Sequence, residues 1–246
     1  SWNDRGIVDS NSYGECNQSN LGTVSGFFFE GLFHDNDPDT QAYRDPKFRY
    51  LLARGIVQGI ISHYGGTTFP PEPPTNFRVR NIGGGQVRLD WTAGPVRDGS
   101  HPYGSAATGY RVYRSTDGYG FDNGTNVTVA NATFTLSPGQ MVFYRVAAVN
   151  SAGVSIPCET LVVRVSATGQ TPALIVNGSH RFDRYLPRLV TGVSGCADSL
   201  VRRIDWRSFQ SFNYTIQHGK ALEFCNVPFD SCSAECVEAG SFRRAL

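Results

Sequence analysis

The cysteines are the residues of this sequence with the widest choice of chemistry. Three of them, Cys225, Cys232 and Cys236, stand close together near the end of the chain. An even cysteine count fits a disulfide framework in an oxidising compartment, although the spacing does not choose among the many pairings. Zinc is the alternative, but no CxxC pair or nearby histidine supplies a fourth ligand to this cluster. The disulfide candidates are Cys16, Cys158, Cys196, Cys225, Cys232 and Cys236.

The tripeptide Asn-x-Ser/Thr, which accepts N-linked glycans in secreted proteins, is a second chemical signal. It occurs six times, whereas the composition predicts about two occurrences by chance. The alternative explanation is that polar turns are rich in Asn, Ser and Thr in any case. Together with the cysteines, these tripeptides favour an extracellular or cell-surface glycoprotein. The glycosylation candidates are Asn17, Asn123, Asn126, Asn131, Asn177 and Asn213.

Metal-dependent and nucleophilic catalysis both lack the residue patterns they need. A catalytic zinc ion takes three protein ligands, and no two of the five histidines have ligand spacing. No Ser-His-acid arrangement or glycine-rich phosphate loop can be identified, and Gly83-Gly84-Gly85 is typical of a turn. We therefore expect no metal site and no cofactor in this chain. The five histidines are His34, His63, His101, His180 and His218.

The composition also argues against nucleic-acid-binding and membrane-spanning proteins. The formal net charge is +1, from 22 basic and 21 acidic residues, which argues against a nucleic-acid partner. Hydrophobic residues make up 40% of the chain, enough to bury a core, yet no run approaches the roughly 20 apolar residues that span a bilayer. The first residues have neither an initiator Met nor the pattern of a signal peptide, so we expect a processed or excised chain.

Two Pro/Gly-rich linkers predict three segments. The first linker, at 66–73, contains prolines that block helix and central strand alike. The second falls between 166 and 172. The predicted units are a partial α/β segment at 1–65, an all-β domain at 74–166 and a second partial α/β segment at 172–246. The expected fold class is therefore mixed.

The central segment alternates apolar and polar residues with period two, in short runs separated by Gly- and Asp-rich turns. This pattern predicts an all-β sandwich. Four runs carry a resemblance to a known family: Gln86-Val-Arg-Leu-Asp-Trp91, Gly109-Tyr-Arg-Val-Tyr-Arg114, Leu136-Ser-Pro-Gly139 and Tyr144-Arg-Val-Ala-Ala-Val-Asn150. The segment resembles the fibronectin type III family over about ninety positions. The loop at 94–108 is longer than that family usually carries, and it is either a contact surface or a tolerated insertion.

The first segment is expected to contain a buried strand at 23–29 that ends at Glu30. A helix should follow, with Asp45 as N-cap and Pro46 at its first position, until Gly65-Gly66 ends it. Four runs of this segment carry a resemblance to a known family: Trp2-x-Asp4-Arg5-Gly6, Phe29-Glu-Gly-Leu-Phe33, Arg44-Asp-Pro-x-Phe48 and Ala53-Arg-Gly-Ile-Val-Gln58. They resemble the C-terminal end of the zinc-dependent N-acetylmuramoyl-L-alanine amidases, which cut peptidoglycan.

This resemblance implies a role for Glu30 as the general acid/base beside a zinc-bound water, should the amidase be complete. A carboxylate at the end of a buried strand suits that role chemically. The family's zinc ligands lie upstream of the matched region, however, so this chain by itself is not expected to hydrolyse peptidoglycan.

The third segment should contain a strand at 173–176, a helix around 212–224, a strand at 227–229 and a short helix with Ser233 as N-cap. Strand, helix and strand in this order suggest the opening of a doubly wound α/β domain. Three runs of this segment carry a resemblance: Asn177-Gly-Ser-His-Arg-Phe-Asp183, Tyr214-Thr-Ile-Gln-His218 and Val227-Pro-Phe-Asp-Ser231. They resemble a class I glutamine-amidotransferase-like domain of some large secreted bacterial amidases.

Two functions are compatible with these observations. The first is a secreted, non-catalytic structural or assembly module derived from a multidomain cell-wall hydrolase. Because half-domains expose apolar edges, we expect head-to-tail self-association, which builds an open filament unless the rotation closes a ring. Cell-wall glycans are a further expected partner. The second function is a fragment of the zinc-dependent amidase itself.

Overall fold

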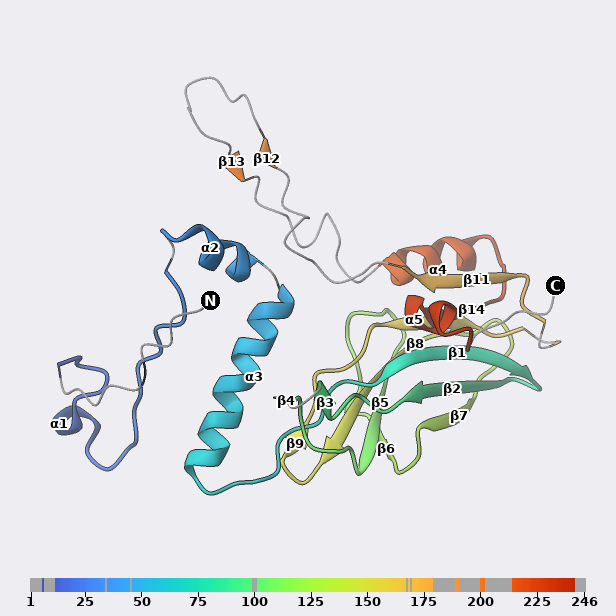
Figure 1. Ribbon diagram of the computed structural model, residues 1–246. Helices are drawn as coiled ribbons and strands as arrows, with labels where there is room; N and C mark the ends of the chain where they lie inside the picture. The colour runs from blue at the N-terminus through green and yellow to red at the C-terminus, as the bar shows by residue number, and fades with distance from the viewer. Residues whose placement is uncertain are drawn as a thin grey trace.

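A computed structural model describes residues 6, 12–33, 35–44, 46–98, 101–166, 168, 170–178, 189–190, 200–201 and 214–241. In Figure 1 the amino-terminal helices (blue) lie to the left of the block of strands, and the carboxy-terminal helices (red) lie over its upper part. The helices are α1 Gln18–Leu21, α2 Asp37–Arg44, α3 Pro46–His63, α4 Tyr214–Phe224 and α5 Ala234–Glu238. The strands are β1 Thr75–Gly83, β2 Gln86–Thr92, β3 Arg97–Asp98, β4 His101–Pro102, β5 Gly109–Ser115, β6 Thr125–Val127, β7 Asn131–Thr135, β8 Met141–Asn150, β9 Gly153–Val154, β10 Leu161–Arg164, β11 Ala173–Asn177, β12 Leu189–Val190, β13 Leu200–Val201 and β14 Phe229–Ser233.

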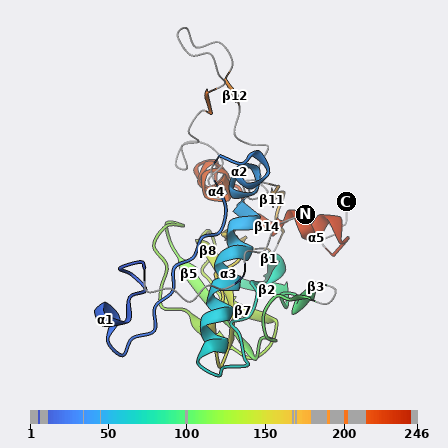
Figure 2. The same ribbon diagram turned by 60° about the vertical axis from the view of Figure 1, so that its left-hand side comes forward.

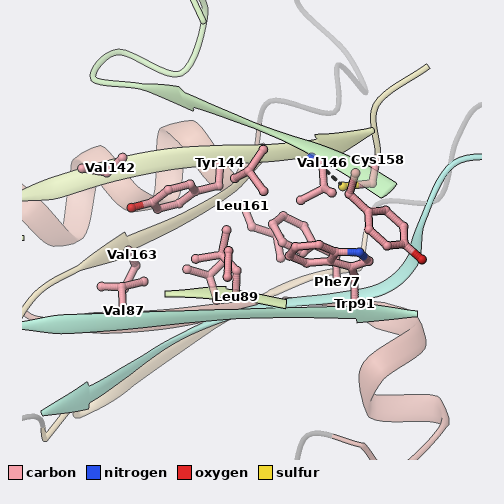
Figure 3. Close-up of a cluster of buried hydrophobic side chains, with 14 of the residues drawn as sticks. Phe77, Val87, Leu89, Trp91, Val142, Tyr144, Val146, Cys158, Leu161 and Val163 are labelled. Atoms are coloured by element: carbon pink, nitrogen blue, oxygen red, sulfur yellow. Dashed lines mark hydrogen bonds between the residues drawn. The ribbon is translucent and has the colours of Figure 1, made fainter. Parts of the chain in front are cut away.

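The central strands form the predicted sandwich with a fibronectin type III-like arrangement. One sheet has the order β7-β2-β1, and the other has the order β6-β5-β8-β10, with every neighbouring pair antiparallel. The period-two residues of both sheets point inward and meet in one core (Figure 3). Trp91 lies at one end of this core, with its ring edge-on to Phe77 and Tyr110 at centroid distances of 6.4 and 5.3 Å. The alternation in the sequence thus identified the inner faces of both sheets correctly.

The carboxy-terminal strand β14 joins the two sheets of the sandwich. It pairs antiparallel with β10 at Phe229 and with β1 at Ser231 and Cys232. On its other side it pairs in parallel with β11 over its whole length. The predicted strand–helix–strand unit is therefore present as β11, α4 and β14, and its strands continue the sheet of the sandwich.

The amino-terminal segment is organised differently. Its described part contains α1, α2 and α3, and residues 25–33 form neither helix nor strand. The buried strand predicted at 23–29 is wrong: Phe27, Phe28 and Phe29 are 60%, 51% and 46% exposed. An apolar run becomes a strand only where a neighbouring edge pairs with it, and no strand lies beside this run among the described residues. In both ribbon views α1 lies away from the sandwich (Figures 1 and 2).

The predicted helix of this segment is confirmed, but among the described residues its apolar side chains cover no core. Helix α3 begins at Pro46 and ends at His63, before Gly65 and Gly66, as expected from the sequence. Ile60 is 41% exposed, and among the described residues before the linker only Ala42 is buried. The helix therefore forms because of its own sequence and of contacts with the linker, which are described below.

Candidate functional site

Two contact surfaces attach the flanking segments to the sandwich, and they are the main candidates for a functional role. The larger surface lies on the outer face of the β5-β8-β10 sheet. Helix α4 covers this face, and strands β11 and β14, which extend the sheet, complete a second apolar core that is separate from the core between the sheets. Three of its members, Phe143, Ile216 and Phe229, are completely buried. The full set of buried residues is Met141, Phe143, Val162, Ile175, Ile216 and Phe229.

Side-chain hydrogen bonds complete this larger surface. Ser231 donates its hydroxyl to the carbonyl of Val162 at 2.6 Å and accepts from the N–H of the same residue at 3.0 Å, so it takes the place of a backbone partner. Thr215 donates to the carbonyl of Thr160 at 2.7 Å. Because buried backbone groups without partners are costly, these bonds make the sandwich and the carboxy-terminal segment depend on each other.

A second set of bonds surrounds Asp230, at the edge where β14 meets β1. The Asp230 carboxylate accepts from the N–H of Asn81 at 2.8 Å, from the side-chain amide of Asn81 at 3.0 Å and from the hydroxyl of Thr171 at 2.9 Å. Residues from β1, from the second linker and from β14 therefore share one carboxylate. This cluster fixes the register of β14 on the sandwich.

The loop between β5 and β6 also packs against α4, through Gly118 and Ile216. Asp117 accepts hydrogen bonds from the N–H groups of Tyr119 at 2.8 Å and Gly120 at 2.9 Å, and these bonds lower the pKa of its carboxyl group to about 2. The loop turns at Gly118, where φ is +84° and an added Cβ would lie 2.7 Å from the side chain of Ile216. Glycine is needed here both for the backbone conformation and for the close approach of α4.

The smaller contact surface joins α3 to the first linker and to the long loop at 94–108. Arg54 pairs with the carboxylate of Glu72 at 2.9 Å, and the two side chains are only 16% and 10% exposed. The guanidinium of Arg54 also lies over the ring of Tyr103, 4.4 Å from its centroid, and Gln58 donates to the Tyr103 carbonyl at 2.7 Å. The long loop, which the sequence left open as a contact surface or a tolerated insertion, thus contacts the amino-terminal helix.

The first linker packs closely against the sandwich. An added Cβ at Gly94 would lie 2.5 Å from the carbonyl oxygen of Pro73, and one at Gly104 would lie 2.4 Å from that of Pro70. Only glycine allows the linker backbone to come this near. The linker backbone is therefore held closely against the sandwich. This places Glu72 within reach of Arg54.

The predicted catalytic residue lies in none of these clusters. Glu30 is exposed and belongs to the segment without helix or strand. No group of three His, Cys, Asp or Glu side chains that could hold a metal ion occurs among the described residues. The part of the chain that the structure describes therefore does not provide the three protein ligands of a catalytic zinc.

The cysteines differ widely in environment. Cys16, Cys225, Cys232 and Cys236 are not joined by disulfides, and Cys196 lies outside the described residues. Burial raises the pKa of the Cys232 thiol to about 12, so this thiol stays neutral and unreactive near neutral pH. Cys236 donates to the carbonyl of Phe77 at 3.3 Å, which ties α5 to β1. Cys158 is buried in the sandwich core, where it accepts from the N–H of Val146 (Figure 3).

The glycosylation candidates also separate by exposure. Asn123 and Asn126 are exposed near β6, while Asn131 and Asn17 are half-buried. Asn17 caps α1 by accepting from the N–H of Ser19 at 2.9 Å. Asn177 is only 5% exposed, so a glycan there would require its side chain to leave the interior. Asn213 lies outside the described residues.

The sequence analysis missed the second core, although the sequence carries a signal for it. Met141-Val142-Phe143-Tyr144 in β8 and Leu161-Val162-Val163 in β10 are continuously apolar instead of alternating. Strands with this pattern are buried on both faces. The signal showed that something covers the outer face of this sheet, but not which segment does so.

Among the comparisons with known proteins, matches were found to solved structures. The twitchin kinase region from C. elegans matches with 24% identity and a TM-score of 0.35, over 42% of this chain and 18% of that chain. A crystal structure of domains from titin matches with 26% identity and a TM-score of 0.31, over 37% of this chain and 30% of that chain. The FN5 domain of Drosophila Lar matches with 17% identity and a TM-score of 0.30, over 39% of this chain and 97% of that chain.

This chain spans less than a third of the twitchin and titin chains that it matches. No protein-family model and no curated protein matches it. The resemblances of the two flanking segments to amidases and amidotransferases therefore gain no support. The fibronectin type III-like fold of the centre follows from its strand order and core, and a fold by itself assigns no function. No helix among the described residues has the length and apolar character that a membrane crossing requires.

Proposed function

We propose that this chain is a non-catalytic structural module of a secreted, extracellular protein, and that it associates head-to-tail with further copies of itself. The sandwich acts as a rigid spacer between the two flanks. A cell-wall hydrolase is the proposed origin of the flanking segments, on the sequence resemblances alone.

The observation that carries the proposal is the exposed apolar run at 24–33. Five large apolar side chains of this run are at least 46% exposed, which is unusual for one short stretch of a soluble protein. Burying such side chains against a partner is favourable by about 25 cal/mol per Å² of apolar surface. The five residues are Val24, Phe27, Phe28, Phe29 and Phe33, with exposures of 62%, 60%, 51%, 46% and 52%.

The proposed occupant is a second copy, at the edge of β11. One side of β11 pairs with β14, and no described strand pairs with its other side. Val176 on this strand is 43% exposed. Aromatic and β-branched residues such as those at 24–29 favour extended strands, and strand addition to a sheet edge is a common mode of association. Such a contact joins the head of one copy to the tail of the next, so the association is heterologous.

The amidase alternative is not developed further. Its resemblance assigns chemistry to Glu30, which is exposed in a segment without helix or strand, and the described residues contain no group of three His, Cys, Asp or Glu side chains that could hold a metal ion. No geometric observation on the described residues favours hydrolysis.

The oligomeric state of the whole chain tests the proposal. Light scattering coupled to gel filtration should show mass rising above that of a 26.9 kDa monomer with increasing concentration. The double substitution Phe27→Asp and Phe29→Asp should return the chain to a monomer while leaving its circular dichroism spectrum unchanged. A wild-type chain that stays monomeric at the highest concentration tested overturns the proposal.

Two matched single substitutions make the test specific. Val24→Asp changes an exposed valine inside the apolar run, and Val129→Asp changes a valine of similar exposure, 56%, outside it. We expect Val24→Asp to weaken association and Val129→Asp to leave it unchanged. Equal effects from both would mean that general charge repulsion is responsible, and would contradict a contact through the apolar run.

A further inference from the structure

A pocket at one end of the β11–α4–β14 unit has the features of a ligand site. Its volume is about 400 Å³, within the range of small-molecule sites. Its walls come from the carboxyl end of β11 and from the first turn of α4. In parallel α/β units, ligands bind beyond the carboxyl ends of the strands. The residues used below are Asn177, Thr215, Gln217 and His218.

The decisive feature is the side chain of Asn177. It is 95% buried, since its exposure is 5%, and it lines the pocket. Neither its amide nitrogen nor its amide oxygen has a hydrogen-bond partner. An amide that is buried without partners costs about 1–3 kcal/mol of stability. Such a group is retained most readily where a bound ligand supplies the missing hydrogen bonds.

The charge environment indicates what kind of ligand fits. The first N–H groups of an α-helix have no acceptor within the helix, and the helix dipole places partial positive charge there. In α4 these groups include the N–H of Thr215, Ile216 and Gln217, and the first turn contains no acidic residue. None of the described lining residues is Asp or Glu, and His218 adds a further polar group. The combination favours an anion.

We propose that this pocket binds a small oxyanion, the phosphate or carboxylate group of a small molecule. The N–H groups of the first turn of α4 donate to the anion, and the Asn177 amide donates a further hydrogen bond from the end of β11. The pocket shares strand β11 with the edge proposed for self-association, but anion binding does not require residues 24–33, which lie in the other flank.

Nuclear magnetic resonance titration of the whole ¹⁵N-labelled chain tests the site. Inorganic phosphate and acetate are added separately, at constant ionic strength adjusted with sodium chloride. We expect saturable shifts of the amide signals of Thr215, Ile216 and Gln217 and of the Asn177 side chain. Shifts with phosphate only identify a phosphate group, shifts with acetate only identify a carboxylate, and shifts with both identify a general oxyanion site. If neither anion causes saturable shifts, the proposal is overturned.

A pair of Asn→Leu substitutions separates binding from folding. Asn177→Leu keeps the size of the side chain but removes its hydrogen-bonding groups, and it should weaken anion binding at least tenfold. In anion-free buffer the same substitution should raise the midpoint of urea unfolding, because it removes a buried amide that has no partner. Asn123→Leu, at an exposed position outside the pocket, should leave anion affinity unchanged. Unaltered affinity in Asn177→Leu contradicts the assignment.

Discussion

The two flanks of the sandwich contain similar amounts of apolar sequence, yet among the residues that the structure describes only those of the carboxy-terminal flank form a core. Its helix α4 buries Ile216 completely against the outer face of the sheet. The amino-terminal helix α3 leaves Ile60 41% exposed, and its Arg54 and Gln58 side chains contact the linker and the long loop. The difference shows that an amphipathic helix is buried only where a complementary apolar face lies within its reach.

Truncation of a core residue should give the largest effect. Phe229→Ala removes a completely buried ring from the second core, and we expect the free energy of unfolding to fall by about 3–5 kcal/mol. Phe224→Ala makes the same change at a position that is 92% exposed, and should change stability by less than about 0.5 kcal/mol. Urea unfolding followed by circular dichroism measures both. If Phe229→Ala changed stability as little as Phe224→Ala, the second core would not stabilise the sandwich.

Loss of the ion pair between Arg54 and Glu72 should affect helix α3 but not the sandwich. Arg54→Met keeps the aliphatic part of the side chain but removes the buried ion pair with Glu72, which should weaken the attachment of α3 by about 1.5–3 kcal/mol. Hydrogen exchange within α3 should then become at least about tenfold faster, while exchange in the sandwich stays the same. Arg49→Met, at an exposed position of the same helix, is the control. Equal exchange rates in both variants would mean that the ion pair between Arg54 and Glu72 does not hold α3 in place.

The turn beneath α4 gives a smaller effect. Gly118→Ala forces alanine into a left-handed conformation and places its Cβ against Ile216, so we expect a loss of about 1–2 kcal/mol. Gly120→Ala lies two residues further along, where an added Cβ would meet only the Asp117 carboxylate oxygen at 4.0 Å, and it should be nearly neutral. Thermal unfolding compares the two. A neutral Gly118→Ala would show that α4 does not approach the loop as closely as described.

The smallest effect is a pH dependence within the same loop. Backbone N–H groups from Tyr119 and Gly120 hold the pKa of Asp117 at about 2, below its ordinary value of 3.8. The ionised carboxylate therefore stabilises the loop above about pH 4, and this contribution is lost as the pH falls from about 4 to 2. The amide signals of Tyr119 and Gly120 should shift over this window. Asp117→Asn keeps an acceptor oxygen and should abolish the titration, and persistence of the shifts in this variant would assign them to another group.

Local patterns in the sequence predicted much of the fold. Period-two alternation identified the inner faces of the sandwich, and the run from Pro46 to the Gly65-Gly66 pair predicted α3 within a residue or two at its end. The same local logic failed for the run at 23–29, because apolar β-formers specify a strand only when an edge is present to pair with. It also could not identify Asn177 as a buried polar group, since the sequence motif at that position indicated only a glycosylation candidate.

The sequence alone determined the elements of the sandwich, the positions of α3 and α4, and the two-sided apolar character of β8 and β10. Only the tertiary structure decided that β14 joins β10 to β1, that α4 covers Phe143, and that Arg54 reaches Glu72 beneath the long loop. The physical reason is that alternation and helix signals act over a few residues. Which covering segment meets which apolar face depends on contacts between residues far apart in the chain, such as Val162 and Ser231.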